Sequence, residues 1–140
     1  MKILIAADGS IYTERMLAHL AAHDEWLNQV HRYTVVHCVE PMPPRAAAYI
    51  PGDVLKLYYA SESERVFEPS RAFFKRHGLH ADHVSRVGDA ARVVAAMADG
   101  DSFDLIIMGS RGHGALAGLL MGSVTMKVLA LSKVPVLIVR

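Results

Sequence analysis

The strongest constraint on the fold of this chain is its alternation of short apolar stretches with longer amphipathic ones. The apolar stretches are rich in β-branched residues, which is typical of strands covered on both faces, and they predict strands over Ile3–Ala7, Tyr33–Val39, His83–Val87, Leu105–Met108 and Val134–Val139. Apolar residues at helical spacing predict helices over Ile11–Trp26, Val54–His77, Ala90–Ala98 and Ser123–Leu131. The order β-α-β-α-β-α-β-α-β predicts an α/β fold, a Rossmann-like open sheet of five parallel strands with helices on both faces.

Serine, glycine and proline positions refine these elements. Ser10 is placed to cap the first helix, and Gly78 occupies the position of a C-terminal cap after the second helical stretch. Pro69 lies inside that stretch, and we expect it to kink the helix or to split it near Glu68, because proline has no amide donor. The proline-rich segment from Glu40 to Asp53 follows no regular pattern, and we expect it to form a lid beside a ligand.

Length and composition limit the kind of protein. The 140 residues are 52% hydrophobic, which suits one domain over residues 1–140 whose core needs neither a disulfide nor a structural metal. A formal net charge of +1 argues against binding to a nucleic-acid duplex, which calls for a basic face. The longest stretch without charged residues, Gly112–Met126, contains several glycines and is too short to span a membrane. The single Cys38 predicts a buried thiol and a reducing, cytoplasmic location, and the early Asp8 argues against a signal sequence.

A glycine-rich loop follows the fourth predicted strand and leads into the last helix. Gly109, Gly112 and Gly122 can bring backbone amides close to a ligand. Ser123 can cap the last helix, whose N-terminus favours anions, and can also donate a hydrogen bond to a phosphate oxygen. These residues predict a site for a polyphosphate, and the alternative is a tight loop without a ligand. The sequence contains no Gly-Lys pair for a Walker motif, and the turn after the first strand lacks the dinucleotide-binding glycine pattern.

The pattern Gly109-x2-Gly112-x9-Gly122-Ser123, placed after an apolar strand, resembles the nucleotide-binding signature of the universal stress protein family. The segments Ile3–Ser10 and Ser132–Val139 also resemble that family's first strand with its acidic turn and its last strand. The resemblance covers essentially the whole chain. It implies a Rossmann-like fold that binds ATP, with or without Mg²⁺.

The resemblance also implies roles for individual residues. In ATP-binding members the acid after the first strand, here Asp8, contacts the adenosine part, and the residue after the second-strand histidine, here Cys38, lies against adenine. Ala6 stands where many binders carry proline, and Cys38 stands where valine is common, so these two positions bear on affinity. The complete set of implied binding residues is Ala6, Ala7, Asp8, Cys38, Met108, Gly109, Arg111, Gly112, Gly122, Ser123 and Val124.

Residue chemistry leaves alternatives at some of these positions. The Asp8 carboxylate can accept hydrogen bonds from a ribose diol or an adenine amine, or it can simply lie near the dipole of the first helix. Arg111 can pair with a phosphate or remain solvated. Ser10 and Thr13 are interpreted as caps of the first helix. Ser110 shares the glycine loop with a histidine, but no orienting acid is evident for a nucleophile and base.

Eight histidines raise the question of a metal site. Neither the pair at helical spacing nor the later set at spacings of three fixes a complete ligand set, and we expect no metal site at His19, His23, His77, His80 or His83.

The function that these observations predict is ATP binding by a dimeric regulatory or stress-response protein whose partner is an adenine nucleotide, with neither nucleic acid nor membrane as partner. The resemblance implies a homodimer through the last strand, and Val134–Val139 supports it because a bare apolar edge strand promotes aggregation. Two other classes stay open. The chain could be a slow ATPase or phosphotransferase, with Asp8 as the best base and Asp89 as a weak second, or an interaction protein whose loop binds no nucleotide.

Overall fold

The computed structural model describes residues 1–114 and 120–140, and all of its strands belong to one sheet. The elements in chain order are β1 Lys2–Ala6, α1 Ile11–Ala21, β2 Arg32–Val39, α2 Pro44–Ala47, α3 Gly52–Arg76, β3 Ala81–Val87, α4 Ala90–Gly100, β4 Leu105–Gly109, α5 Ser123–Leu131 and β5 Val136–Val139. The five strands run parallel in the order β3-β2-β1-β4-β5. This arrangement confirms the predicted α/β fold.

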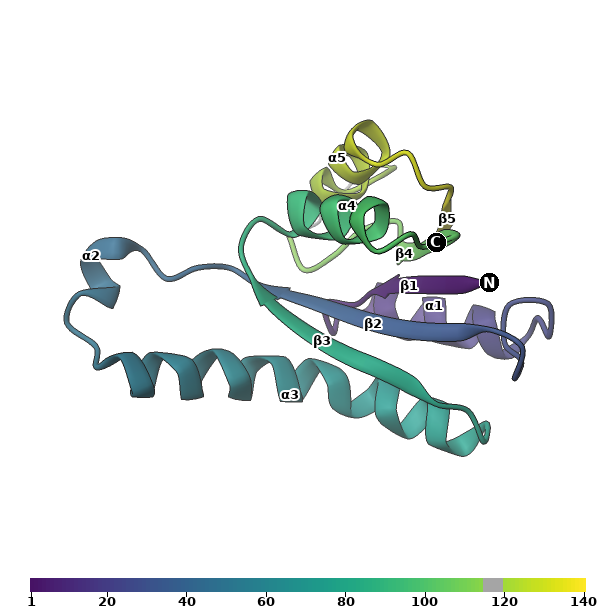
Figure 1. Cartoon of the computed structure of the whole chain (residues 1–140), viewed down its shortest axis with the longest axis horizontal. Coiled ribbons are helices and arrows are strands. Elements are labelled where there is room, and N and C mark those ends of the chain that lie inside the picture. Colours follow the sequence, from purple (N-terminus) through teal and green to yellow (C-terminus); the bar gives the residue numbers. More distant parts are fainter. Residues whose placement is uncertain (115–119) are drawn as a thin grey trace.

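Helices cover both faces of the sheet, α1 and α3 on one side and α4 and α5 on the other (Figure 1). Along β1, Ile3 and Ile5 face the α1–α3 layer and Leu4 faces the α4–α5 layer, and all three side chains are fully buried. Continuous burial of this kind is why the strands appear in the sequence as unbroken apolar stretches.

The strand order brings two loops together. The chain moves from β1 through β2 to β3 on one side of the sheet and then crosses over to β4 on the other side of β1. Ala6 therefore lies opposite Met108 in the parallel register of β1 and β4. Loops that leave adjacent strands at such a reversal enclose the usual ligand position of an open α/β sheet.

Helix α1 is shorter than predicted, ending at Ala21 instead of Trp26. Trp26 and Leu27 pack against the same core as α1, but from the turns that follow the helix. The apolar spacing therefore continues after the helical backbone has ended, which explains the overestimate.

Helix α3 passes through Pro69 without a break, so the predicted split is wrong. Pro69 is on the solvent side, while Phe67, Phe73 and Phe74 are buried against the sheet. Burial of three aromatic side chains contributes roughly 1.5–3 kcal/mol each, which exceeds the cost of about 3 kcal/mol for a proline in a helix.

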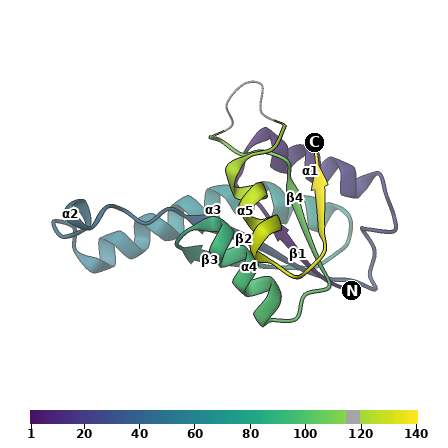
Figure 2. The same ribbon diagram turned by 90° about the horizontal axis from the view of Figure 1, so that it is seen from above.

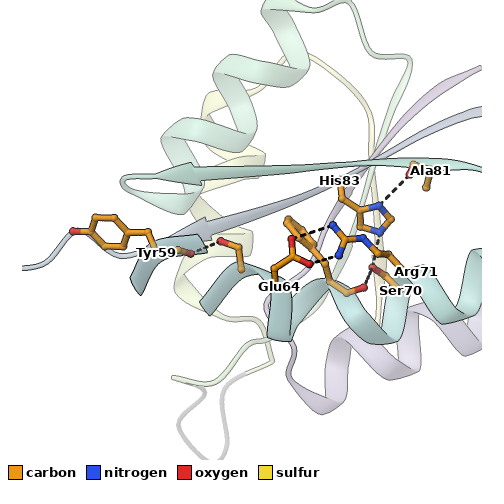
Figure 3. Close-up of polar contacts among 8 residues, drawn as sticks. Tyr59, Glu64, Ser70, Arg71, Ala81 and His83 are labelled. Atoms are coloured by element: carbon orange, nitrogen blue, oxygen red, sulfur yellow. Dashed lines mark hydrogen bonds and ion pairs between the residues drawn. The ribbon is translucent and has the colours of Figure 1, made fainter. Parts of the chain in front are cut away.

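Polar side chains also join α3 to the edge strand β3 (Figure 3). Ser70 Oγ lies 2.8 Å from the carbonyl oxygen of Phe67 and 2.9 Å from Nε2 of His83, whose Nδ1 lies 3.0 Å from the carbonyl oxygen of Ala81. Burial lowers the pKa of His83, and the nearby Arg71 lowers it further. The neutral ring is thus the favoured state in this contact.

The segment expected to form a lid contains the short helix α2 and runs into the first turns of α3. Both project beyond the sheet as an arm (Figure 2). Residues 40–53 do not line the cleft described below, so the expectation of a lid is wrong.

Differences at the other element ends are small. Gly78 lies one position beyond the C-cap His77 and has φ +64°, a left-handed conformation that glycine adopts without strain. β3 begins two residues earlier than predicted, at Ala81, and β5 begins at Val136, after Pro135, which cannot donate to a ladder. Among the described residues, no helix combines the length and the apolar character that a membrane crossing requires.

Candidate functional site

A cleft of about 230 Å³ lies at the carboxyl ends of β1 and β4, at the reversal of strand order. The eleven binding residues implied by the sequence all line it: Ala6, Ala7, Asp8, Cys38, Met108, Gly109, Arg111, Gly112, Gly122, Ser123 and Val124. They come from β1, β2, β4, the loop after β4 and the start of α5. The fold therefore brings together residues that are spread over most of the chain.

Asp8, the acid after β1, is held by the start of α1. Its Oδ1 accepts hydrogen bonds from the Ser10 N–H and the Thr13 hydroxyl, both at 2.9 Å, and its own N–H donates to Thr13 Oγ1 at 3.1 Å. Burial acts to raise the pKa of Asp8, but the hydrogen bonds from Ser10 and Thr13, together with a smaller electrostatic effect of His113, outweigh it, and the pKa lies below its usual value. Asp8 is therefore an ionised carboxylate in the wall of the cleft. Ser10 is the N-cap residue of α1 but its side chain makes no capping hydrogen bond, and the side chain of Thr13, the third residue of the helix, binds Asp8 instead of capping the helix.

Glycines let the loop after β4 approach this acid. A Cβ on Gly112 would collide with Asp8 Oδ2, and a Cβ on Gly109 would lie 2.8 Å from the Cβ of Tyr12. A side chain at Gly112 would fill the space between the loop and the β1 turn, and one at Gly109 would collide with α1, so both close approaches require glycine.

The far end of the loop is tied to α5. Thr125 Oγ1 lies 3.1 Å from the Gly109 carbonyl oxygen and 3.3 Å from that of Ser110, and the Gly122 N–H donates to the Ser110 carbonyl at 2.8 Å. Gly122 is the N-cap residue and Ser123 is the first helical residue, so the predicted capping role of Ser123 is wrong. An extended backbone at Gly122 takes the cap position, and the exposed Ser123 lines the cleft beside the helix N-terminus.

Arg111 lines the cleft and contacts Tyr12 of α1. One of its guanidinium nitrogens lies 3.3 Å from the Tyr12 hydroxyl, and the guanidinium carbon is 5.9 Å from the centre of that ring. The positive charge is therefore held on the α1 side of the cleft.

The cleft also has an apolar part. Val36 and Cys38 of β2, Val94 of α4 and Met108 of β4 all line it. Burial raises the pKa of Cys38 to about 11, with a further increase from the negative charge of Asp89 and a smaller opposing effect from Arg86. Cys38 is partly rather than fully buried, and it presents a neutral thiol to the cleft.

Comparison with known proteins identifies the family. The chain matches the universal stress protein family over residues 1–140. It belongs to the universal stress protein family. The universal stress protein in the QAH/OAS sulfhydrylase 3′ region of Thermus aquaticus is 35% identical over 141 residues, covering 99% of this chain and 97% of the relative.

Solved structures of the universal stress protein fold are also similar. The hypothetical protein MJ0577 has a TM-score of 0.82 at 28% identity, with 99% of this chain and 94% of that one covered. A family member from Arabidopsis thaliana with AMP bound has a TM-score of 0.72 at 14% identity, covering 99% and 90% of the two chains. A universal stress protein in complex with cAMP has a TM-score of 0.71 at 23% identity, covering 100% and 97%. At identities of 14% and 23%, the similarity to the AMP-bound and cAMP-bound structures shows a shared fold only.

Several cleft residues of this universal stress protein were missed by sequence reasoning. They are Thr13, Val36, His37, Ala90, Val94, His113, Gly114 and Thr125. His37 Nδ1 lies 2.9 Å from the Ala7 carbonyl oxygen, so this ring joins β2 to the end of β1. The sequence offered one signal for His37, His113 and Thr125 as cleft residues, which is that each stands next to a residue of the motifs. The side-chain directions, however, depend on how the loops close.

The candidate acids and histidines for other chemistry are placed differently. Asp89 does not line the cleft: it caps α4 by accepting the Arg92 N–H at 3.0 Å and lies 3.9 Å from the ammonium group of Lys127. Asp89 is therefore no candidate for a base in this cleft. Within residues 1–114 and 120–140, no three or more His, Cys, Asp or Glu side chains form a group that could hold a metal ion.

Proposed function

We propose that this universal stress protein binds an adenine nucleotide, ATP among them, in the cleft between the β1 turn and the glycine loop. The observation that carries the proposal is the division of the cleft into chemically different parts. One wall is apolar, a carboxylate stands at the end of β1, and glycines with a helix N-terminus occupy the third side.

Each part suits one portion of a nucleotide. The apolar wall at Cys38 and Met108 can accept the flat face of a base, and Asp8 Oδ2 can accept hydrogen bonds from ribose hydroxyls. The first-turn amides of α5, at residues 123–125, have no intrahelical partners and carry the positive end of the helix dipole, which favours phosphate. A bound nucleotide would place its phosphates against these amides.

Gly112 supports this fit, since a Cβ there would collide with Asp8 Oδ2 in the cleft, whereas glycine at position 109 is required by the packing of β4 against Tyr12 of α1. Relatives of the same fold are described with AMP and with cAMP bound, which adds support for the ligand class.

Calorimetric titration with ATP and Mg²⁺ tests the proposal on the natural chain and on Gly122→Val. A Cβ at Gly122 would lie 3.2 Å from the Arg111 Cα, so valine displaces the loop and blocks the phosphate approach. Gly100→Ala is the matched control, because a Cβ at Gly100 meets nothing within 4 Å. Saturable binding that Gly122→Val abolishes and Gly100→Ala retains supports the proposal. A folded natural chain without bound nucleotide that fails to bind ATP refutes it and favours the interaction protein. The same samples, assayed for phosphate release, test the slow ATPase.

We further propose a cytoplasmic, dimeric regulatory protein whose second copy covers β5. Among residues 1–114 and 120–140, this strand pairs only with β4. Met126, Leu129 and Leu131 on the neighbouring α5 are about half exposed, at 52%, 42% and 51%. An apolar edge strand beside exposed apolar side chains is stabilised when a second copy covers it. Sedimentation velocity at micromolar concentration tests this point, and a monomer there refutes it.

A further inference from the structure

His113, the residue after Gly112 in the glycine loop, contacts Asp8 twice. Its backbone N–H lies 3.3 Å from Asp8 Oδ2, and its ring Nε2 lies 2.9 Å from the Asp8 carbonyl oxygen. Because a carbonyl oxygen only accepts, the ring carries a proton on Nε2 and donates it. His113 therefore joins the loop after β4 to the turn after β1, and both segments line the cleft.

The two oxygens of the Asp8 carboxylate are occupied unequally. Oδ1 accepts two hydrogen bonds of 2.9 Å from the start of α1, whereas Oδ2 has, from the part of the chain that the structure describes, one long contact with the His113 N–H. Each carboxylate oxygen has about two acceptor sites. Oδ2 is therefore the atom that retains capacity for a ligand, and it is also the atom against which Gly112 lies.

The direction of the His113 ring argues against a direct contact with phosphate. Its backbone N–H and its Nε2 both point at Asp8. The contacts of His113 therefore act on the part of the ligand next to Asp8.

We propose that His113 is a positioning residue for the nucleoside part of the ligand. Its ring fixes the distance between the glycine loop and Asp8. At that distance, Asp8 Oδ2 and the backbone amides of the loop reach the same ligand hydroxyls. This inference rests on the proposed nucleotide binding and adds a specific role for one residue within that site.

The test compares three ligands on three variants of the full chain. Adenosine, AMP and ATP with Mg²⁺ are titrated calorimetrically into the natural chain, His113→Ala, His113→Gln and the control His80→Ala. The His80 side chain is 89% exposed and has its contact with Asp82, outside the cleft. His113→Ala is expected to weaken all three ligands by the same factor, about fivefold, the effect of losing one neutral hydrogen bond. His113→Gln is expected to recover the affinity because its amide N–H can donate to the same carbonyl, and His80→Ala is expected to bind as the natural chain does.

Amide hydrogen exchange without ligand separates loop positioning from a general loss of stability. Exchange at residues 112–114 should be faster in His113→Ala and normal in His113→Gln, with no change across the core strands. Should His113→Ala unfold, the glutamine variant still decides the question.

The results that overturn the inference are distinct from those that overturn nucleotide binding. A loss of affinity for ATP alone identifies a phosphate contact and contradicts the positioning role, as do unchanged affinities for all three ligands. If the natural chain binds none of the three, the proposed function fails and this inference fails with it.

Discussion

Thr13→Val is the sharpest test of how the candidate site is built, because valine keeps the shape of threonine and removes the hydroxyl. Thr13 is 5% exposed, and its Oγ1 donates to Asp8 Oδ1 at 2.9 Å and accepts from the Asp8 N–H at 3.1 Å. A hydrogen bond to a charged group contributes about 1.5–3 kcal/mol and a neutral one about 0.5–1.5 kcal/mol. Asp8 is only partly buried, so the lower ends apply, and we expect a loss of about 2 kcal/mol.

Urea unfolding measures this loss as a lower midpoint with an unchanged slope. For a domain of this size, each kcal/mol corresponds to roughly 3–4 °C in Tm, so the expected decrease is about 7 °C.

The pH dependence provides a second, independent readout. The folded-state pKa of Asp8 is lowered, so Asp8 contributes stability above its unfolded pKa, and this contribution is lost as pH falls through the folded pKa. Thr13→Val removes the hydrogen bond from the Thr13 hydroxyl, which is one cause of the lowered pKa of Asp8. The stability difference between the two proteins should therefore narrow below about pH 4, where Asp8 begins to protonate in the unfolded chain.

Two substitutions control for effects unrelated to the hydroxyl. Thr13→Ser keeps the hydroxyl and should lose no more than about 0.8 kcal/mol for one methyl group. Thr34 is 9% exposed on β2 and makes no side-chain hydrogen bond to another described residue, so Thr34→Val should leave stability nearly unchanged. A Thr13→Val protein within about 0.5 kcal/mol of the natural chain, or one with an unchanged Asp8 pKa by carboxyl ¹³C NMR, would refute the reasoning.

Three further predictions concern residues around the sheet. The pKa of His83 is lowered by burial and by Arg71, so stability should decrease as pH falls below about 6.5, and urea unfolding of His83→Gln should show a smaller decrease. Cys38, with a pKa of about 11, should react with iodoacetamide at pH 8 much more slowly than after unfolding in guanidinium chloride; equal rates contradict the buried thiol. Asp89→Ala should cost about 1 kcal/mol in urea unfolding, because Asp89 caps α4 through the Arg92 N–H, and an unchanged midpoint argues against the cap.

Periodicity predicted the fold because the sheet is buried on both faces. The strands appear as apolar stretches, and their alternation with helical stretches leaves few other arrangements. Two of the errors concern the extent of helices. The effect of Trp26 and Pro69 on helix length depends on where each side chain lies relative to the sheet. Trp26 packs against the core, and Pro69 faces solvent. A pattern confined to one segment does not contain that information.

The candidate site could be located from the sequence because its residues follow strands whose carboxyl ends meet. Asp8 follows β1 and the glycines follow β4, and adjacency of those two strands brings them together. The contact between His113 and Asp8 joins positions 105 residues apart, and it depends on the path of the loop. No pattern within one segment predicts a contact between residues so far apart in the sequence. Glycines in the loop after β4 and an acid after β1 predict only that the two backbones can approach each other.

The start of α1 shows why the two interpretations of Asp8 do not exclude each other. Ser10 and Thr13 were interpreted as helix caps and Asp8 as either a ligand contact or a helix-terminal acid. In the structure, the Ser10 N–H and the Thr13 hydroxyl satisfy Oδ1 of Asp8, while Oδ2 lines the cleft. A carboxylate in a partly apolar cleft stays ionised only if some of its hydrogen bonds come from the protein itself. The groups that begin the helix supply those bonds, so the helix start and the acidic part of the site are one structure, and disturbing either one should change both stability and ligand affinity.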